Sequence, residues 1–176
     1  MKFIKYILFV LMPVALHAQT VHVDEDRIVY KNKKTVIQAD KHELFERAQI
    51  AMERIKWNKQ RIVVENRDEG LITARGTMKL ATPYHTIRTV EYLFELKVED
   101  GEYKYRIDSV YMEEKERGGK TMRLSSEKLL KAVEETGKVS KDAEKVLNEI
   151  DMNFQKLLAL IQADMKESVS TEVTSK

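Results

Sequence analysis

The strongest constraint on the fold is a hydrophobic alternation that extends in both directions from the dipeptide Asp100-Gly101. Asp-Gly is typical of the two central residues of a β-hairpin, and it predicts a type I′ turn here. Counting outward from the turn gives the apolar cross-strand pairs Val98 with Tyr103, Leu96 with Tyr105, and Phe94 with Ile107. The other face pairs Glu95 with Arg106 and Lys97 with Lys104. The pattern predicts an antiparallel sheet with one apolar and one polar face.

A second alternation occupies the stretch DEGLITARGTMKL, which ends at Leu80. Gly70 is expected to take a positive φ in a turn, and the residues after it alternate between an apolar and a polar face. The spacing of Gly70 and Gly76 matches neither GxGxxG nor GxxxxGK, and a strand pattern follows, so a phosphate-binding loop is not supported. Gly76 on the apolar face indicates either a close approach of a helix to the sheet or a bulge.

Helical periodicity lies on both sides of these strands. Asp40, with Glu43 three residues later, forms a capping-box pattern at the start of a predicted helix over residues 41–56. Two further helices are predicted over residues 125–136 and 140–165, and the second has a continuous apolar stripe. These helices supply the apolar surface that a sheet with one apolar face requires.

The segment before the first helix has two β-prone patches. RIVY (residues 27–30) and TVIQ (residues 35–38) flank the polar run KNKK, and they indicate a hairpin or an edge extension of the sheet. With the other elements they predict an α+β fold, in the order strand, helix, four strands, helices. The expected architecture is a twisted antiparallel sheet with helices packed on one face.

The first residues have the pattern of a secretory signal peptide. Lys2 and Lys5 precede an apolar run over residues 6–16, and the small residue Ala18 offers a cleavage site. The run is about half of the ~20 residues that a spanning helix needs, so no transmembrane segment is expected. We therefore expect export to the periplasm or beyond after cleavage near Ala18, with an uncleaved N-terminal anchor as the alternative.

Composition limits the partners of the mature chain. Without residues 1–18 the chain has 29 basic and 29 acidic residues, because Lys2 and Lys5 are lost from the original 31 basic ones. A formally neutral chain outside the cytoplasm is not expected to bind nucleic acid. The chain has no cysteine, which excludes disulfides, thiolate metal sites and cysteine nucleophiles.

The residues that most often carry chemistry are scattered. His22, His42 and His85 have no partner at the spacings that zinc sites use. Ser126 and Ser140 lie at predicted helix starts, where capping explains them. We therefore predict no catalytic residue, no metal site and no cofactor.

Two further features are candidate sites. Tyr103, Tyr105 and Tyr111 are expected on the apolar face, where they indicate core, although such a row also suits a ligand groove. The charged segment over residues 113–123 predicts a solvated mobile loop. Its candidate residues are Lys115, Arg117, Gly118, Gly119 and Lys120.

Three stretches together resemble a known family: ADKHELFERAQIAM, NRDEGLITARGTMKL and YLFELKVEDGEYKYRIDSV. They resemble the domain of unknown function with a TBP-like fold that is found in secreted proteins of the Bacteroides group. The resemblance covers residues 35–111 and implies the fold and a secreted destination, with no assigned activity. The expected organisation is a signal peptide (1–18), an N-terminal arm or extra hairpin (19–34), one TBP-like domain (35–166) and a disordered tail (167–176).

The functional hypothesis is an exported, non-catalytic binding or adaptor module. The partner would be an unknown protein or a small apolar ligand, and the chain would be a monomer or a weak homodimer through its last helix. The alternatives are a periplasmic carrier holding a lipid between the sheet and that helix, and an envelope hydrolase with a hidden site. The candidate binding face consists of Thr73, Arg75, Thr77, Lys79, Glu95 and Arg106.

Overall fold

The computed structural model describes residues 22–36, 38–55, 59–81, 86–116, 119, 121–134 and 141–166. The N-terminal strands are β1 (Val23–Asp24), β2 (Arg27–Ile28) and β3 (Tyr30–Thr35). The central elements are α1 (Lys41–Arg54), β4 (Lys59–Asn66), β5 (Leu71–Leu80), β6 (Thr86–Glu99) and β7 (Glu102–Glu116). The last elements are β8 (Thr121–Ser125), α2 (Ser126–Glu134) and α3 (Lys141–Lys166).

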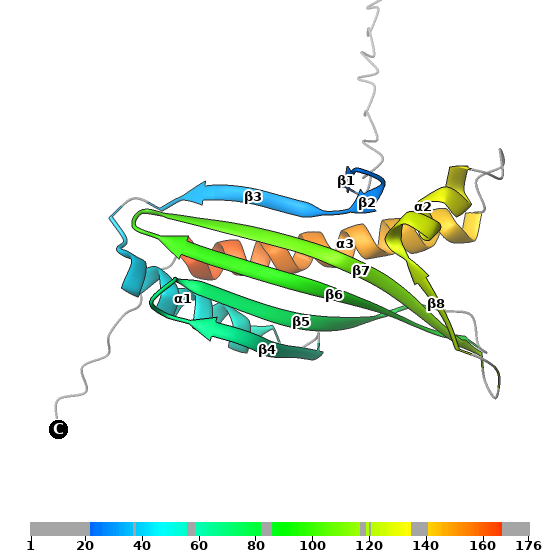
Figure 1. Ribbon diagram of the computed structural model, residues 1–176, viewed down its shortest axis with the longest axis horizontal. Helices are drawn as coiled ribbons and strands as arrows, with labels where there is room; N and C mark the ends of the chain where they lie inside the picture. Colours follow the sequence, from blue (N-terminus) through cyan, green and yellow to red (C-terminus); the bar gives the residue numbers. More distant parts are fainter. Residues whose placement is uncertain are drawn as a thin grey trace, which may run out of the picture.

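One antiparallel sheet dominates the molecule, with the strand order β3-β7-β6-β5-β4. Strand β8 also pairs with β7, on the half of β7 that β3 leaves free. Helices α1 and α3 lie behind the sheet in the view of Figure 1, and the strands face the reader. The predicted α+β architecture, a twisted antiparallel sheet with helices on one face, is confirmed.

The predicted register of the central hairpin is confirmed in each of its pairs. Val98 lies opposite Tyr103, and Lys97 lies opposite Lys104. Acidic neighbours compensate the charge of Lys104, because its ammonium group lies 3.1 Å from Glu99 and 3.2 Å from Glu102. These contacts raise the pKa of Lys104 and lower that of Glu99.

The type I′ prediction for the turn is wrong. Gly101 has a φ of 72°, but Asp100 does not take the positive φ that type I′ requires at both central residues. The Asp100 carboxylate instead accepts a hydrogen bond from the amide of Lys41, and the Gly101 amide donates to the carbonyl of Ala39. Hydrogen bonds to the residues at the start of α1 therefore hold the turn. They override the type I′ geometry that Asp-Gly favours in an isolated hairpin.

Helix α1 begins as its sequence predicts. The side chain of Asp40 accepts a hydrogen bond from the Glu43 amide at 2.8 Å, which satisfies one of the free N–H groups of the first turn. The helix ends at Arg54, two residues before the predicted end. Its buried face includes Leu44, Phe45, Ala48, Ala51 and Met52.

The core lies between the sheet and the two helices. The stripe of α3 that the sequence predicts is buried from Val146 to Ile161, and it continues to Met165. The ring of Phe154 makes edge contacts with Tyr30 and Tyr92, each at a centroid distance of 5.1 Å. Residues from β3, β6 and α3 thus meet at one aromatic cluster, which fixes the helix against the sheet.

The two glycines of the first predicted turn and strand have different roles. Gly70 has a φ of 66° in the turn between β4 and β5, as predicted. Gly76 lies on the buried face opposite Tyr92, and the Tyr92 ring occupies the space where a side chain would begin. The close neighbour of Gly76 is therefore a cross-strand tyrosine, and the expected helix contact or bulge is wrong.

The N-terminal hairpin between RIVY and TVIQ is also wrong. The polar run KNKK lies inside β3, which is the edge-extension alternative, and a smaller hairpin forms between β1 and β2. An edge strand tolerates this composition because one face of it is solvated, and edge lysines discourage pairing with other chains. Lys31 and Lys33 occupy that solvated side.

The expected loop over residues 113–123 is largely sheet. Strand β7 continues to Glu116, and β8 begins at Thr121. Lys115 pairs with Ile87 on one side and with Thr121 on the other, so its assignment to a mobile loop is wrong. Charged residues are stable in these strands because cross-strand ion pairs hold them, as in the 2.7 Å contact of Arg88 with Glu114.

Several predictions fall on residues outside the described ranges. They include the signal peptide and its cleavage near Ala18, the loop candidates Arg117, Gly118 and Lys120, and the tail over residues 167–176. Gly119 is described as an exposed bend. No helix within the described ranges is both long and apolar enough to span a membrane.

Candidate binding face

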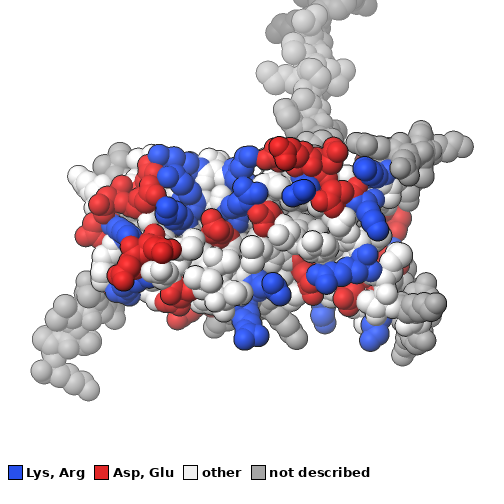
Figure 2. Space-filling model, viewed as in Figure 1, with Lys and Arg blue, Asp and Glu red and all other residues white. Residues whose placement is uncertain are grey.

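The face of the sheet opposite α1 and α3, here called the open face, carries the candidate site. Figure 2 shows that its charged side chains surround a central area of uncharged residues. The area lies over β5, β6 and β7 when the view is compared with Figure 1. An uncovered sheet face with an uncharged centre and a charged rim has the composition pattern of many interfaces.

All six predicted face residues lie on this open face. Thr73, Arg75, Thr77 and Lys79 alternate with buried neighbours along β5. Glu95 of β6 lies between Thr73 of β5 and Arg106 of β7. The structure therefore brings Glu95 and Arg106 beside the β5 residues, as the predicted face requires.

Arg106 is already engaged in an ion pair. Its guanidinium lies 2.6 Å from the carboxylate of Asp108, and this hydrogen bond raises the pKa of Arg106. The partner is two residues away on the same strand, where the alternation of a regular strand places both side chains on the same face. Arg106 therefore contributes to the rim of the open face as half of a neutral pair.

A bulge in β7 changes which residues reach the open face. Ser109 has a φ of 51°, and the pairing of β6 with β7 shifts register between Glu91 and Leu93. A bulge inserts an extra residue into one strand, so the alternation beyond it is displaced by one. Tyr111 consequently points to the open face, where it is 38% exposed.

The predicted aromatic row is therefore only partly correct. Tyr103 and Tyr105 are buried in the core as expected, at 1% and 8% exposure, and Phe94 is fully buried. The assignment of Tyr111 to the same face is wrong because of the bulge at Ser109. Signals for the bulge in the sequence are weak, since serine does not favour a positive φ.

A hollow of about 140 Å³ lies at this bulge. Its lining includes Leu93, Ser109 and Tyr111, together with the cations Arg75 and Arg123 and the acid Glu91. Leu93 is opposite Arg75 in the β5–β6 pairing, so one apolar and one cationic group sit side by side. The arrangement suits a partner that brings a small apolar group together with a negative charge.

Arg123 is a residue of this site that the sequence did not reveal. Its guanidinium lies 4.6 Å from the centroid of the Tyr111 ring and 2.7 Å from Glu91. The cation–π contact and the ion pair hold the exposed Tyr111 ring in place. The sequence places Arg123 in a loop. Its strand, β8, pairs with β7, and this pairing brings Arg123 beside Tyr111.

A second hollow, of about 110 Å³, borders the first along Ser109 and Tyr111. It lies between β7, β8 and the start of α2, and its lining is mainly polar. The guanidinium of Arg27 lies 3.1 Å from Glu127 in this hollow. A hydrogen bond from Ser125 and the first-turn backbone lower the pKa of the Glu127 carboxyl.

An arginine pair lies at the β4 side of the open face. Arg61 and Arg75 are directly opposite each other in the β4–β5 pairing, and both are exposed. Neither has an ion pair with any described residue. Like charges at this spacing repel each other, so an anion placed between them would be stabilised.

Of the residues considered for catalysis and metal binding, Ser126 borders the second hollow, whereas His22 and His42 line neither hollow. His42 in α1 lies 2.8 Å from Arg67 and 3.5 Å from Glu46, and His22 packs against Tyr30. Ser126 begins α2, and His85 and Ser140 are not described. Within the described ranges, no group of three His, Asp or Glu side chains is arranged to hold a metal ion.

Comparison with known proteins supports the fold. Residues 30–113 match the family described as a domain of unknown function (DUF4468) with TBP-like fold. The chain is similar to the crystal structure of a TBP-like protein from Parabacteroides distasonis, with a TM-score of 0.67 and 11% identity over 84% of this chain and 98% of that one. It is also similar to a DUF4468 family protein from Bacteroides ovatus, with a TM-score of 0.65 and 13% identity over 88% of this chain and 94% of that one.

No curated protein matches the sequence of this chain. The two structural neighbours have low sequence identity, so their likeness concerns the fold alone. The resemblance to a Bacteroides-group family with a TBP-like fold, stated from the three sequence stretches, is confirmed.

Proposed function

We propose that this protein, whose residues 30–113 match the DUF4468 family with its TBP-like fold, is an exported, non-catalytic binding module of the bacterial envelope. It binds its partner on the open face of the sheet. The observation that carries the proposal is Tyr111, an aromatic residue that a strained backbone position turns out of the core and an arginine holds in place.

The exposure of Tyr111 has a cost in conformational energy at Ser109. A serine at a φ of 51° is held in a sparsely populated conformation, at a cost of about 1–3 kcal/mol. Its effect is to expose a large aromatic side chain beside a hollow, which by itself does not stabilise the fold. Aromatic residues and arginines are the side chains that most often dominate binding energy at protein interfaces.

Export is proposed from the N-terminal sequence. The basic residues, the apolar run and Ala18 have the order of a signal peptide, and the remaining chain has no cysteine that a lipid could modify. A mass measurement on the protein from the envelope fraction tests this proposal. A chain beginning at Gln19 is expected, and a full-length chain in the cytoplasm would contradict export.

The lipid-carrier alternative has less support. It requires space at Phe94, Tyr103 and Tyr105, and these side chains are packed in the core. An apolar ligand between the sheet and α3 would have to displace them. For the hydrolase alternative, the two hollows of the open face contain no histidine among their described lining residues, so they offer no serine–histidine pair.

Photo-cross-linking in the producing cells tests the proposed binding face. A photoreactive phenylalanine analogue replaces Tyr111 on the open face or, as a matched control, Met152, which is exposed on α3. We expect a covalent adduct of defined mass from position 111 and none from position 152. An adduct from position 152 alone, or from neither position, would contradict binding on the open face.

A further inference from the structure

Strand β4 is a free edge of the sheet. It is the last strand in the order, and within the described part of the chain it pairs with β5 alone. Three consecutive β-branched residues are exposed along it: Ile62 at 41%, Val63 at 55% and Val64 at 42%. An exposed apolar edge offers unpaired backbone groups and apolar side chains to another extended chain.

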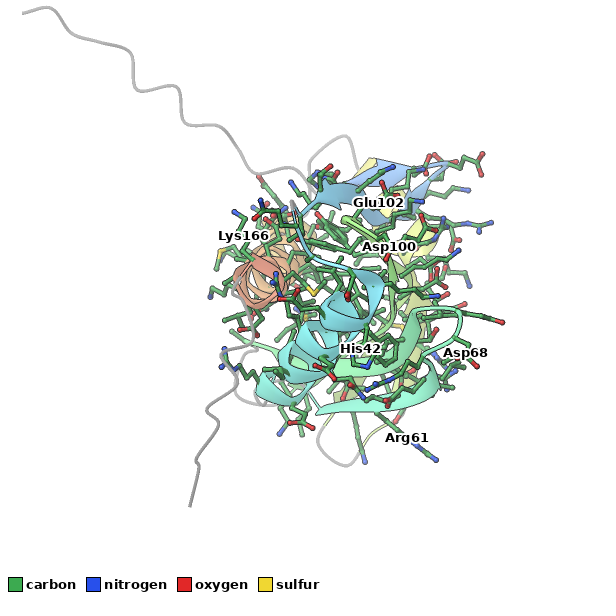
Figure 3. The ribbon with its side chains drawn as sticks, turned by 90° about the vertical axis from the view of Figure 1, so that its left-hand side faces the viewer. His42, Arg61, Asp68, Asp100, Glu102 and Lys166 are labelled. Atoms are coloured by element: carbon green, nitrogen blue, oxygen red, sulfur yellow. The ribbon has the colours of Figure 1, made fainter. Side chains whose placement is uncertain are left out.

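The edge also carries an uncompensated charge. Arg61 lies opposite Arg75 on the open face, and neither arginine has an acidic partner among the described residues. Figure 3 shows Arg61 extending from the sheet margin, away from α1 and α3. A strand added beside β4 would place one of its side chains about 5 Å from Arg61, on the same face.

We propose that β4 binds an extended acidic segment of a partner protein by strand addition. The backbone of the segment pairs with the free edge of β4, and a glutamate or aspartate of the segment lies opposite Arg61. Its carboxylate neutralises the Arg61–Arg75 pair, while apolar neighbours of that residue contact Ile62. The inference rests on the proposed function, because it names the class of partner that the binding module takes.

The bulge in β4 argues against a second copy of this chain as the occupant. Val63 and Val64 together occupy one register position, so Arg61 faces the open side whereas Glu65 faces the helix side. An antiparallel pairing of two β4 strands with Arg61 opposite Glu65 would therefore join side chains from opposite faces. Glu65 is also engaged by the side chain of Gln49 at 2.5 Å.

Synthetic peptides and amide hydrogen exchange test the inference. The probe alternates threonine and valine on both sides of one central glutamate, and matched probes carry glutamine or lysine at the centre. In the purified protein we expect the glutamate probe to slow exchange over residues 59–66. The glutamine probe should bind about tenfold more weakly, since it lacks the charge that the two arginines attract.

A charge reversal provides the specificity control. Arg61→Glu should abolish the preference for the glutamate probe and make the lysine probe the tighter ligand. Lys156→Glu makes the same change of charge at an exposed position of α3, away from the open face and from the β4 edge, and should leave the order of the three probes unchanged. Arg61 is exposed, so its replacement is not expected to unfold the protein.

The possible outcomes are distinct. Protection of β4 that follows the charge of the probe, and reverses in Arg61→Glu, supports the inference. Equal protection by all three probes, protection confined to β7 and β8, or no protection would overturn it, as would protection that rises with protein concentration alone. None of these failures alters the Tyr111 cross-link, so the proposed open face can stand if the β4 inference fails.

Discussion

The hydroxyl of Tyr30 in β3 donates a 2.6 Å hydrogen bond to the carboxylate of Asp151 in α3. The two residues are 2% and 1% exposed, and they are 121 positions apart in the sequence. Burial and this hydrogen bond raise the pKa of the Tyr30 phenol well above its usual range. The contact attaches an edge strand of the sheet to the middle of the long helix.

Removing that hydroxyl should be costly. In Tyr30→Phe the packing is retained but the buried Asp151 loses a donor, so we expect the free energy of unfolding to fall by about 1–3 kcal/mol. Urea unfolding followed by circular dichroism measures it. Tyr111→Phe removes a hydroxyl from an exposed tyrosine and should change stability by less than ~0.5 kcal/mol. Equal effects of the two changes would contradict this role of the Tyr30–Asp151 bond.

A side chain at Gly76 should displace the ring of Tyr92. A Cβ at this position would overlap the ring, and Tyr92 is 1% exposed in the aromatic cluster with Phe154. We expect Gly76→Val to lower the free energy of unfolding by about 2 kcal/mol or more, because overpacking forces buried groups to move. Gly119→Ala, at an exposed bend, should be nearly silent, and similar melting temperatures for both variants would count against the contact.

Stability should fall at alkaline pH through Tyr103. Burial raises the pKa of Tyr103 to about 12 from its usual value of 10.0. A group whose pKa is raised in the folded state contributes stability that is complete below pH 10 and lost as the pH rises toward 12. Tyr103→Phe should therefore reduce the fall of the urea unfolding midpoint as the pH rises between these values. A midpoint that falls as steeply with pH in the variant as in the wild type would show that Tyr103 does not titrate in this way.

Replacing one member of the arginine pair should stabilise the fold. In Arg61→Glu a like-charge cross-strand pair becomes an ion pair with Arg75, and we expect a gain of about 0.2–1 kcal/mol. Added salt should reduce the gain, because both positions are exposed. Thermal unfolding at low and high salt measures the effect. A loss of stability at low salt would mean that Arg61 has a favourable contact elsewhere.

Those elements that depend on local sequence were predicted well. The N-cap bond from the Glu43 amide to Asp40 fixes the start of α1, and the position of Gly101 fixes the β6–β7 register. Strand β8 is not predicted, and the polar part of β3 is left open between a hairpin and an edge extension, because pairing with β7 decides the structure of both segments. Their charged residues find partners only once the strands are adjacent.

The candidate site was predicted only in part. The alternation along β5 places Arg75 and its neighbours on the open face without knowledge of the fold. Tyr111 was misplaced because a single residue, Ser109, adopts a positive φ and reverses the alternation after it. Arg123 and Leu93 join the site through pairings across three strands, which the spacing of residues along one strand does not reveal.

The most direct test of the open face is calorimetric titration of the cross-linked partner into the wild-type protein and two variants. Tyr111→Ala removes the ring at the hollow, and Met152→Ala removes an apolar side chain of similar exposure from α3. We predict that Tyr111→Ala weakens binding by about tenfold or more and that Met152→Ala leaves it unchanged. Equal affinity of the wild type and Tyr111→Ala, with weaker binding by Met152→Ala, would contradict the open face as the binding surface.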